Sequence, residues 1–395
     1  MESLARHGFQ IEALCGPVVD AIPGGDPADV IAERDPDCRA LGGRENDVWM
    51  IGTPGVRMTD PPRVVATIGG VPLTAVRRPL RRNTPADPFE MGEFLSLFDA
   101  TFDRLRPDVV VTYGGDPITL EVLARARRRG AATVFTLHNF GYDNSSHFVN
   151  VDAILVPSQF SAEHHRRVLG VDCVPLPCLI DADRIKVERE GRGYVTFVNA
   201  SVEKGVYPFV RIADELGKRR PDIPFLVIES RGTEANLVDC GIDLRSHGNV
   251  FLMAQTPDPR DFWRVTRICL MPSLWWESQG LVAVEAMTNG IPVIASDRGA
   301  LPETLGDSGV VLPLPVRLTA TSRELPSAEE VGPWIEAILR LWDDDDSSLE
   351  CRRSALSESS RWHADELEPR YLEFFQDVRA AVATATPITA ERDPC

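Results

Sequence analysis

One segment combines acidic side chains, a glycine and a helix start in a spacing that suits the binding of hydroxyl and phosphate groups. It reads MPSLWWESQGLVAVEAMTNGIPVIASDRGALPE and covers residues 271–303. The pattern predicts a strand, then a loop with Glu277 and Gly280, then a helix with Glu285. Free N–H groups at a helix start suit phosphate or sugar oxygens, and a carboxylate inside the helix can accept hydrogen bonds from both hydroxyls of a ribose. The segment therefore indicates a ligand site at the carboxyl end of a strand.

Two cations follow other predicted strands. Lys204 lies in FVNASVEKGVYPFVRIA (197–213), after a strand and before a helix. A lysine there suits a diphosphate, whose negative charge grows as its bond to a sugar breaks. Arg231 follows the strand PFLVIES (224–230) and is either a second cation for that site or a surface arginine.

The first half of the chain has polar residues at two strand ends. His138 lies in TLHNFGY (136–142), at the end of a strand, with Asn139 and Tyr142 close enough in sequence to reach a second substrate. Tyr113-Gly114-Gly115-Asp116 ends another strand, and its glycines either admit a ligand or make a tight turn.

Short apolar strands alternate with helices along most of the chain, which is typical of parallel sheets covered by helices on both faces. The strands are predicted at 10–15, 64–69, 108–113, 132–138, 153–158, 173–177, 193–199, 224–230, 249–254, 267–273 and 291–296. The main helices are predicted at 88–106, 117–130, 158–170, 205–219 and 281–290, with a helical tail over 329–383. The fold class is therefore α/β, with two doubly wound, Rossmann-like domains in tandem.

The charged, glycine-ended stretch around 178–192 separates the two alternating blocks and is interpreted as a hinge. We expect an N-terminal domain over 1–185, a second domain over 186–365, and a C-terminal helix over 366–385 that crosses back to the first domain. A doubly wound domain usually opens with a strand and a glycine-rich turn. SLARHG (3–8) instead looks like the end of the first helix, so the first strand of the N-terminal domain is expected to be missing.

The E-S-Q-G-L-V-A-V-E run has the form Glu-x7-Glu, and it resembles the motif of the family 4 retaining glycosyltransferases, the glycogen-synthase-like group with the GT-B fold. The run E-A-M-x-x-G-I-P-V-I-A-S-D-x-G-x-L-P-E that follows is also similar to that family. The resemblance covers nearly the whole chain and is strongest over 191–313. It implies a hexosyltransferase-like enzyme that takes a sugar from a nucleotide-diphospho-sugar and keeps the anomeric configuration.

The resemblance also implies roles for single residues. Glu285 would bind the ribose hydroxyls of the donor, and Glu277 the hydroxyls of its sugar. His138 would lie near the reacting sugar, and Lys204 would stabilise the departing diphosphate. The family usually has an arginine where this chain has Asn199, so Arg231 is a hypothesis for the missing cation. The donor sugar and diphosphate would also contact backbone of the loop and helix start, at Gln279, Gly280, Leu281 and Val282.

Composition excludes several other classes of protein. The chain has 395 residues and a net charge of −17, which argues against a nucleic-acid-binding protein. No stretch is apolar and long enough for a transmembrane helix, and the start lacks a signal-peptide pattern. The eight cysteines show no zinc spacing, so reduced thiols and a cytoplasmic protein are expected.

No cofactor or divalent metal is expected in the chemistry. Asp181-Ala182-Asp183 has the Asp-x-Asp form of a metal motif but lies in the presumed hinge. The basic run RRPLRRN (77–83) is a solvated loop or a contact for an anionic acceptor or a membrane surface.

Three other functions remain open from the sequence: a non-catalytic or truncated nucleotide-sugar-binding protein, a nucleotide-sugar epimerase, and an assembly protein that binds no nucleotide. Asn199 and the missing strand favour the first of these. The donor nucleotide, the sugar, the acceptor (a glycan, lipid or small metabolite) and the oligomeric state cannot be deduced.

Overall fold

The computed structural model describes residues 1–16, 26–32, 35, 37–41, 63–78, 86–188 and 193–384. The chain divides into two compact units. The first consists of Met1–Thr136, Ser146–Ala153 and Tyr371–Cys395, and the second of Leu137–Ser145 and Ile154–Arg370. No helix of the described ranges is both long and apolar enough to cross a membrane.

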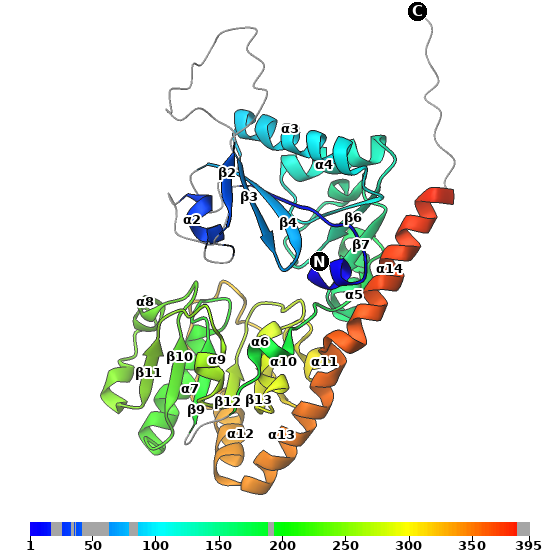
Figure 1. Cartoon of the computed structure of the whole chain (residues 1–395). Helices are drawn as coiled ribbons and strands as arrows, with labels where there is room; N and C mark the ends of the chain where they lie inside the picture. The colour runs from blue at the N-terminus through cyan, green and yellow to red at the C-terminus, as the bar shows by residue number, and fades with distance from the viewer. Residues whose placement is uncertain are drawn as a thin grey trace, which may run out of the picture. The chain divides into compact units, whose positions relative to one another are not determined.

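The second unit is built around a six-stranded parallel sheet with the order β11-β10-β9-β12-β13-β14, and Figure 1 labels its strands from β11 to β13. Its strands are β9 (Tyr194–Val198), β10 (Phe225–Ile228), β11 (Val250–Met253), β12 (Thr266–Met271), β13 (Val293–Ser296) and β14 (Val310–Leu312). Counted along the chain, this is the order 3-2-1-4-5-6 of a doubly wound domain, and the strand order reverses between β9 and β12.

Successive side chains of each strand enter different cores, because they point to opposite faces of the sheet. In β10, Phe225 and Val227 join the cluster that covers one face, whereas Leu226 and Ile228 join the cluster on the other. Burial on both faces explains why these strands read as continuous apolar runs.

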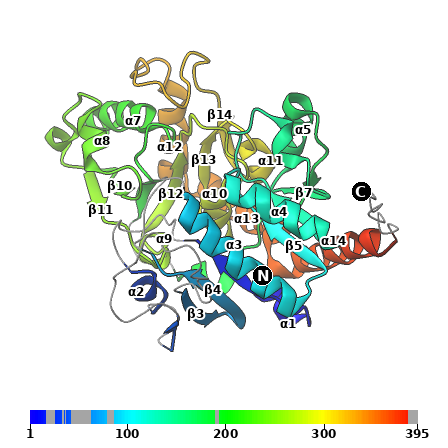
Figure 2. The same ribbon diagram turned by 90° about the horizontal axis from the view of Figure 1, so that it is seen from above.

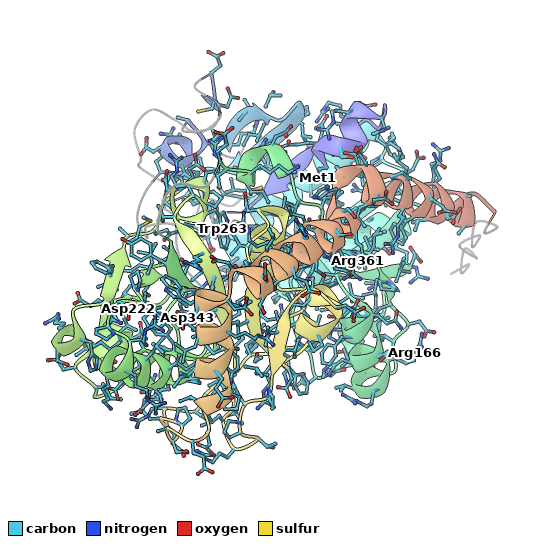
Figure 3. All side chains as sticks on the ribbon, turned by 90° about the horizontal axis from the view of Figure 1, so that it is seen from below. Met1, Arg166, Asp222, Trp263, Asp343 and Arg361 are labelled. Atoms are coloured by element: carbon cyan, nitrogen blue, oxygen red, sulfur yellow. The ribbon has the colours of Figure 1, made fainter. Side chains whose placement is uncertain are left out.

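Helices cover both faces of this sheet. They are α7 (Val206–Arg219), α8 (Glu234–Val238), α9 (Arg260–Trp263), α10 (Leu281–Thr288), α11 (Leu301–Leu305), α12 (Gly332–Asp343) and α13 (Asp345–Ser359). Ion pairs also tie helix ends together, since Arg220 after α7 pairs with both Asp222 and Asp343, which lie close together in Figure 3.

The second unit also contains β7 (Ala153–Val156) from Ile154 on, α5 (Gln159–Leu169), β8 (Val174–Pro175) and α6 (Ala182–Ile185). β7 and β8 pair in parallel. The last helix, α14 (Ala364–Thr384), is divided between the units at Arg370.

The first unit has a mixed sheet with the order β1-β4-β3-β2. Its strands are β1 (Ala13–Cys15), β2 (Arg39–Leu41), β3 (Arg63–Ile68) and β4 (Val71–Val76). β1 pairs in parallel with β4, whereas β3 pairs antiparallel with β2 and with β4, so the expectation of parallel strands is wrong for β3. The cause is Gly69-Gly70, where both residues have positive φ and close a tight hairpin.

The rest of the first unit follows the predicted pattern. β5 (Val109–Thr112) and β6 (Ala132–Thr136) pair in parallel, and α3 (Pro88–Leu105) and α4 (Pro117–Arg128) lie side by side in Figure 2. Two helices precede these elements, α1 (Glu2–Arg6) and α2 (Pro27–Ala32), and the 3-10 turn η1 (Ser145–Phe148) follows β6.

Candidate active site

Two loops meet where the strand order of the six-stranded sheet reverses. One follows β9 and carries Lys204, and the other follows β12 and carries Glu277. At such a point the connections leave the sheet in opposite directions, which opens a crevice outside the carboxyl ends of the strands. The topology therefore brings together two residues that lie 73 positions apart in the sequence.

Lys204 and Glu277 form a direct ion pair. The Lys204 Nζ donates to Glu277 Oε1 at 2.6 Å, and the Ser273 hydroxyl donates to the same oxygen at 2.9 Å. Glu277 is buried, whereas the Lys204 side chain keeps 31% of its surface exposed. Since Oε1 already has two donors, Oε2 is the oxygen of Glu277 that is left for a ligand hydroxyl.

The backbones of the two loops lock together behind this pair. The N–H groups of Leu274 and Trp275 donate to the Glu203 carbonyl at 2.9 and 2.8 Å. A Cβ at Gly205, which has a φ of +88°, would lie 1.8 Å from the Pro272 carbonyl oxygen. This close approach requires a glycine next to Lys204 and holds the lysine at a defined place.

Helix α10 begins directly after the Glu277 loop. Gly280, with a φ of +84°, precedes its first turn, and the first N–H that bonds back to the Gly280 carbonyl is that of Ala283. The N–H groups of Leu281 and Val282 belong to the first turn, where a helix offers donors to an anion. Gln279 is buried, and its carbonyl accepts a hydrogen bond from the Thr304 hydroxyl.

Glu285 lies one turn inside α10 and is half-buried. Its Oε2 accepts a hydrogen bond of 3.1 Å from the indole N–H of Trp263, which is fully buried at the end of α9. Burial raises the pKa of Glu285, and the indole N–H offsets part of that rise. A ligand diol would add donors that favour the charged carboxylate.

Asn199 has a structural role that sequence reasoning missed. Its φ is +67°, a region that asparagine tolerates better than most residues. Its Oδ1 accepts the N–H of Gly232 at 2.9 Å, so it braces the loop that contains Arg231, and only its Nδ2 remains for a ligand. Arg231 itself is exposed.

His138 is linked through Cys178 to Gln279, in the loop that carries Glu277. Its Nδ1 lies 4.0 Å from the Cys178 sulfur, and the Cys178 backbone N–H donates to Gln279 Oε1 at 2.9 Å. Gln279 Nε2 also donates to the Cys178 carbonyl at 3.5 Å. Partial desolvation lowers the pKa of His138, which favours a neutral imidazole at neutral pH.

Other predicted positions have local roles in the structure. Asp116 accepts the N–H groups of Ile118 and Thr119 and so caps α4, while Tyr113 is largely exposed. Asp181 caps α6 and pairs with Arg184 at 3.0 Å, and the described residues contain no cluster of acidic, His and Cys side chains that could hold a metal ion.

The described part of the basic run is also occupied locally. Arg77 pairs with Asp26 and Arg78 with Glu93, whereas residues 79–83 lie outside the described residues. Asn139 is exposed and Tyr142 is half-buried, both in the segment that follows Leu137.

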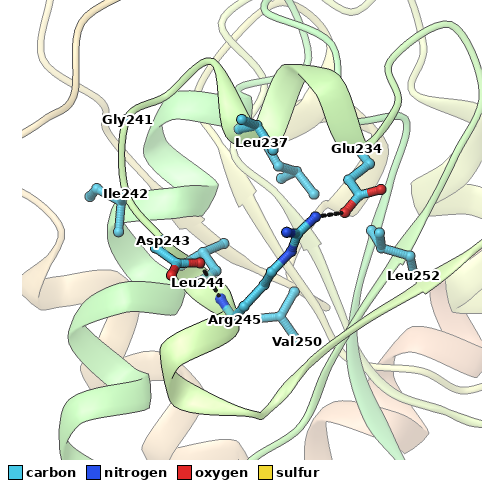
Figure 4. A pocket seen from close by; sticks show the side chains of 10 residues that line it. Glu234, Leu237, Gly241, Ile242, Asp243, Leu244, Arg245, Val250 and Leu252 are labelled. Atoms are coloured by element: carbon cyan, nitrogen blue, oxygen red, sulfur yellow. Dashed lines mark hydrogen bonds and ion pairs between the residues drawn. The ribbon is translucent and has the colours of Figure 1, made fainter.

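A pocket of about 380 Å³ lies elsewhere in the second unit, between α8, β11 and the turn around Asp243. Figure 4 shows apolar side chains of its lining, among them Leu237 and Leu252, around the Arg245–Glu234 ion pair. None of the predicted site residues lines this pocket.

The chain matches two family models that together cover most of its length. The model described as "Glycosyl transferases group 1" matches residues 192–344, and the model described as "Glycosyltransferase Family 4" matches residues 38–184. Each of the two alternating blocks of the chain therefore matches a glycosyltransferase model.

Curated relatives match part of the chain. A D-inositol 3-phosphate glycosyltransferase of Corynebacterium kroppenstedtii is 32% identical over 170 residues, which is 41% of this chain and 34% of that protein. A phosphatidyl-myo-inositol mannosyltransferase of Mycolicibacterium smegmatis is 31% identical over 168 residues, 40% of this chain and 43% of that protein. These matches thus span less than half the length of either relative.

Solved structures support the fold over nearly the whole chain. The sucrose-phosphate synthase of Thermosynechococcus elongatus superposes with a TM-score of 0.65 and 16% identity, covering 96% of this chain and 92% of that one. This likeness confirms the predicted GT-B architecture of two Rossmann-like domains.

Proposed function

We propose that this glycosyltransferase transfers a sugar from a nucleotide-diphospho-sugar to an acceptor, without a metal ion or other cofactor and with retention of configuration. The observation that carries the proposal is the Lys204–Glu277 pair beside the start of α10, at the reversal point of the six-stranded sheet. It places a cation, a carboxylate oxygen and helix N–H donors within one set of loops. Such a set matches the charges of a diphosphate and the hydroxyls of a sugar.

Each group then has a role in the reaction. Glu285 accepts the ribose hydroxyls, Glu277 accepts a hydroxyl of the sugar, and His138 lies at the reacting sugar. Lys204 and the N–H groups of the 280–282 backbone stabilise the diphosphate as it leaves. Asn199 and Arg231 border this end of the donor site.

The bond changes balance without an enzyme nucleophile. The acceptor oxygen forms a bond to the anomeric carbon on the face that the diphosphate leaves, and the bond from that carbon to the phosphate oxygen breaks. The acceptor proton passes to that phosphate oxygen. Within this proposal the acceptor binds to the domain over 1–185 and the donor to the domain over 186–365.

The acceptor is the least constrained partner. The names of two relatives contain an inositol compound. Inositol phosphates are therefore the first acceptors to test, with phosphatidylinositol as the lipid form.

A second function, a donor-binding protein without turnover, is favoured by Asn199. This residue uses its Oδ1 on Gly232 and supplies no positive charge where the family has an arginine. Both functions predict nucleotide binding, and only the first predicts sugar transfer.

The test is a calorimetric titration with UDP, GDP, ADP and dTDP on the wild type and on Lys204→Ala. One nucleotide should bind, and the substitution should weaken it about tenfold or more, which corresponds to about 1.4 kcal/mol. Lys218→Ala is the matched control, because Lys218 is a half-exposed lysine of α7 that pairs with Asp214. If none of the four nucleotides binds, the donor site proposed here is wrong.

A further inference from the structure

The carboxylate of Glu303 leaves its own helix and binds the start of another. Its Oε1 accepts the backbone N–H of Gln159 and its Oε2 that of Phe160, each at 2.9 Å. These are the first two N–H groups of α5, which have no partner within the helix. A negative charge at this end also interacts favourably with the helix dipole. Glu303 ends the L-P-E part of the sequence motif and has no role in the reaction proposed above.

A second contact joins α5 to the loop of Glu277. The hydroxyl of Ser161, in the first turn of α5, donates to the Ser278 carbonyl at 3.2 Å. Helix α5 is therefore attached at its start both to α11, which carries Glu303, and to the loop before α10. Figure 2 shows α11 beside α5.

An aromatic cluster joins one face of α5 to both segments that carry the predicted reaction groups. Trp276, next to Glu277, packs edge-on against His164 with ring centroids 5.0 Å apart. Phe140, two residues after His138, stacks on His165 at 5.4 Å and meets Trp276 edge-on at 5.9 Å.

His165 behaves as an aromatic packing surface in this cluster. It is 1% exposed, and neither of its ring nitrogens has a hydrogen-bond partner within the described ranges. An imidazolium without partners would be costly in such surroundings, so the ring stays neutral.

We propose that α5 is the positioning element that holds the His138 segment against the Glu277 loop, and that Glu303 is its anchor. Helix α5 itself contacts no reacting atom. It fixes the distance between His138 and Glu277, because Phe140 and Trp276 rest on its aromatic face while Glu303 and Ser278 hold its first turn. This inference deepens the proposed function, on which its catalytic meaning rests.

The first test needs no substrate. Hydrogen exchange of the wild type, Glu303→Gln and Glu163→Gln is compared in peptides that cover 137–145 and 158–164. Glu163 is the matched control, since it is an exposed glutamate of α5 that bonds only the Gln159 side chain among the described residues. Glu303→Gln should speed exchange at least tenfold in both peptides, because an amide offers one acceptor where the carboxylate offers two.

An NMR titration of His138, assigned with His138→Ala, gives an independent readout. If the segment loosens in Glu303→Gln, the pKa of His138 moves up toward its ordinary value. Exchange and titration like those of Glu163→Gln would overturn the proposal. Ser161→Ala is the milder variant, to be used if Glu303→Gln fails to fold. It should speed exchange about threefold in the same peptides. An unchanged exchange rate in this variant would overturn the proposal.

Kinetics separate positioning from a merely structural role. Glu303→Gln should lower kcat about tenfold or more while the donor KM and the nucleotide affinity stay within about twofold. If the substitution lowers both the nucleotide affinity and the melting temperature, Glu303 is a folding residue and the proposal is overturned. Failure of the proposed function has a different signature, the absence of nucleotide binding in the wild type, and it leaves the exchange result standing.

Discussion

The loop before α10 and helix α10 itself each carry one carboxylate of the Glu-x7-Glu motif, and their surroundings differ. In the loop, Glu277 is buried with a lysine and a hydroxyl already bonded to it. In the helix, Glu285 is half-buried, and its one hydrogen-bond donor among the described residues is neutral, the indole of Trp263. The charge of Glu277 is thus balanced within the protein, so a diphosphate must share Lys204 with it. Glu285 has donors to gain from a ligand.

The surroundings of Glu277 in the loop are tested by the substitution Glu277→Gln. Glu277→Gln keeps a hydrogen-bonding side chain but removes the charge that holds Lys204, so the lysine becomes available to phosphate. We expect turnover to fall about 100-fold (about 2.7 kcal/mol), whereas the affinity for a nucleoside diphosphate without sugar stays equal or rises. Steady-state kinetics and calorimetry check the two parts. A loss of nucleotide affinity as large as that of Lys204→Ala would contradict the idea that Glu277 competes for the lysine.

A fall in pH should have opposite effects on the contributions of His165 and Glu285 to the stability of the fold. Burial, with a smaller contribution from the charge of His164, lowers the pKa of His165 on α5 to about 4, against about 6.5 in the unfolded chain. The neutral ring therefore stabilises the fold above pH 6.5, and this stability is lost as the pH falls toward 4, by about 2 kcal/mol at pH 5. The pKa of Glu285 is raised instead, so its protonation favours the folded state as the pH falls.

The measurement is the free energy of unfolding in urea at pH 7.5 and pH 5. His165→Phe should reduce the loss on acidification, because it keeps the stacking on Phe140 and cannot be protonated. Glu285→Gln should increase that loss. An identical pH dependence in the wild type and His165→Phe would show that His165 is not the group that acid titrates.

The surroundings of Glu285 in the helix are tested by the substitution Trp263→Phe. The substitution removes the indole N–H from Glu285, so the pKa of Glu285 should rise further and the charged form should be harder to keep. A hydrogen bond to a charged group contributes about 1.5–3 kcal/mol, so nucleotide affinity should fall about tenfold or more. Calorimetry at several pH values should show the loss shrinking as the pH rises. Phe262→Leu, next to Trp263 on α9, controls for packing.

The smallest effect is expected at Asn199, which lies outside both carboxylate environments. Asn199→Ala loses the bond to Gly232 and places alanine at a positive φ, at a cost of about 1 kcal/mol in stability. Nucleotide affinity should change less than threefold while the melting temperature falls. A tenfold loss of affinity without a change in melting temperature would instead make Asn199 a direct donor ligand.

Strand and helix periodicity predicted the six-stranded sheet well, because strands buried on both faces have a strong apolar signal. Of its six strands only β14 was missed, and its three residues are too few for such a signal. The β3–β4 hairpin was also missed, although the Gly69-Gly70 pair between two Val-rich runs was a usable sign of a tight turn.

The sequence predicted that Lys204 and Glu277 follow two strands of one sheet, and the structure brings these two residues together. Their contact was not predicted, because the Lys204–Glu277 bond depends on the register of two loops that meet only in the folded chain. Trp263 gave no signal at all, since it lies on a four-residue helix 22 positions before Glu285. His164 and His165 lay within the predicted helix over 158–170, and the packing of His164 against Trp276 follows from tertiary structure alone.

The glycines of the loops have a practical consequence for protein engineering. A Cβ at Gly205 or Gly232 would overlap backbone atoms of Pro272 or Ala200, and one at Gly299 would lie 2.3 Å from the Glu277 carbonyl oxygen. Any library that randomises these loops in search of a new ligand preference will lose most members that change these three positions, whatever side chain they introduce. Diversity is better spent on the exposed side chains of Trp275 and Leu281, where a new shape can reach a ligand without moving the backbone that supports it.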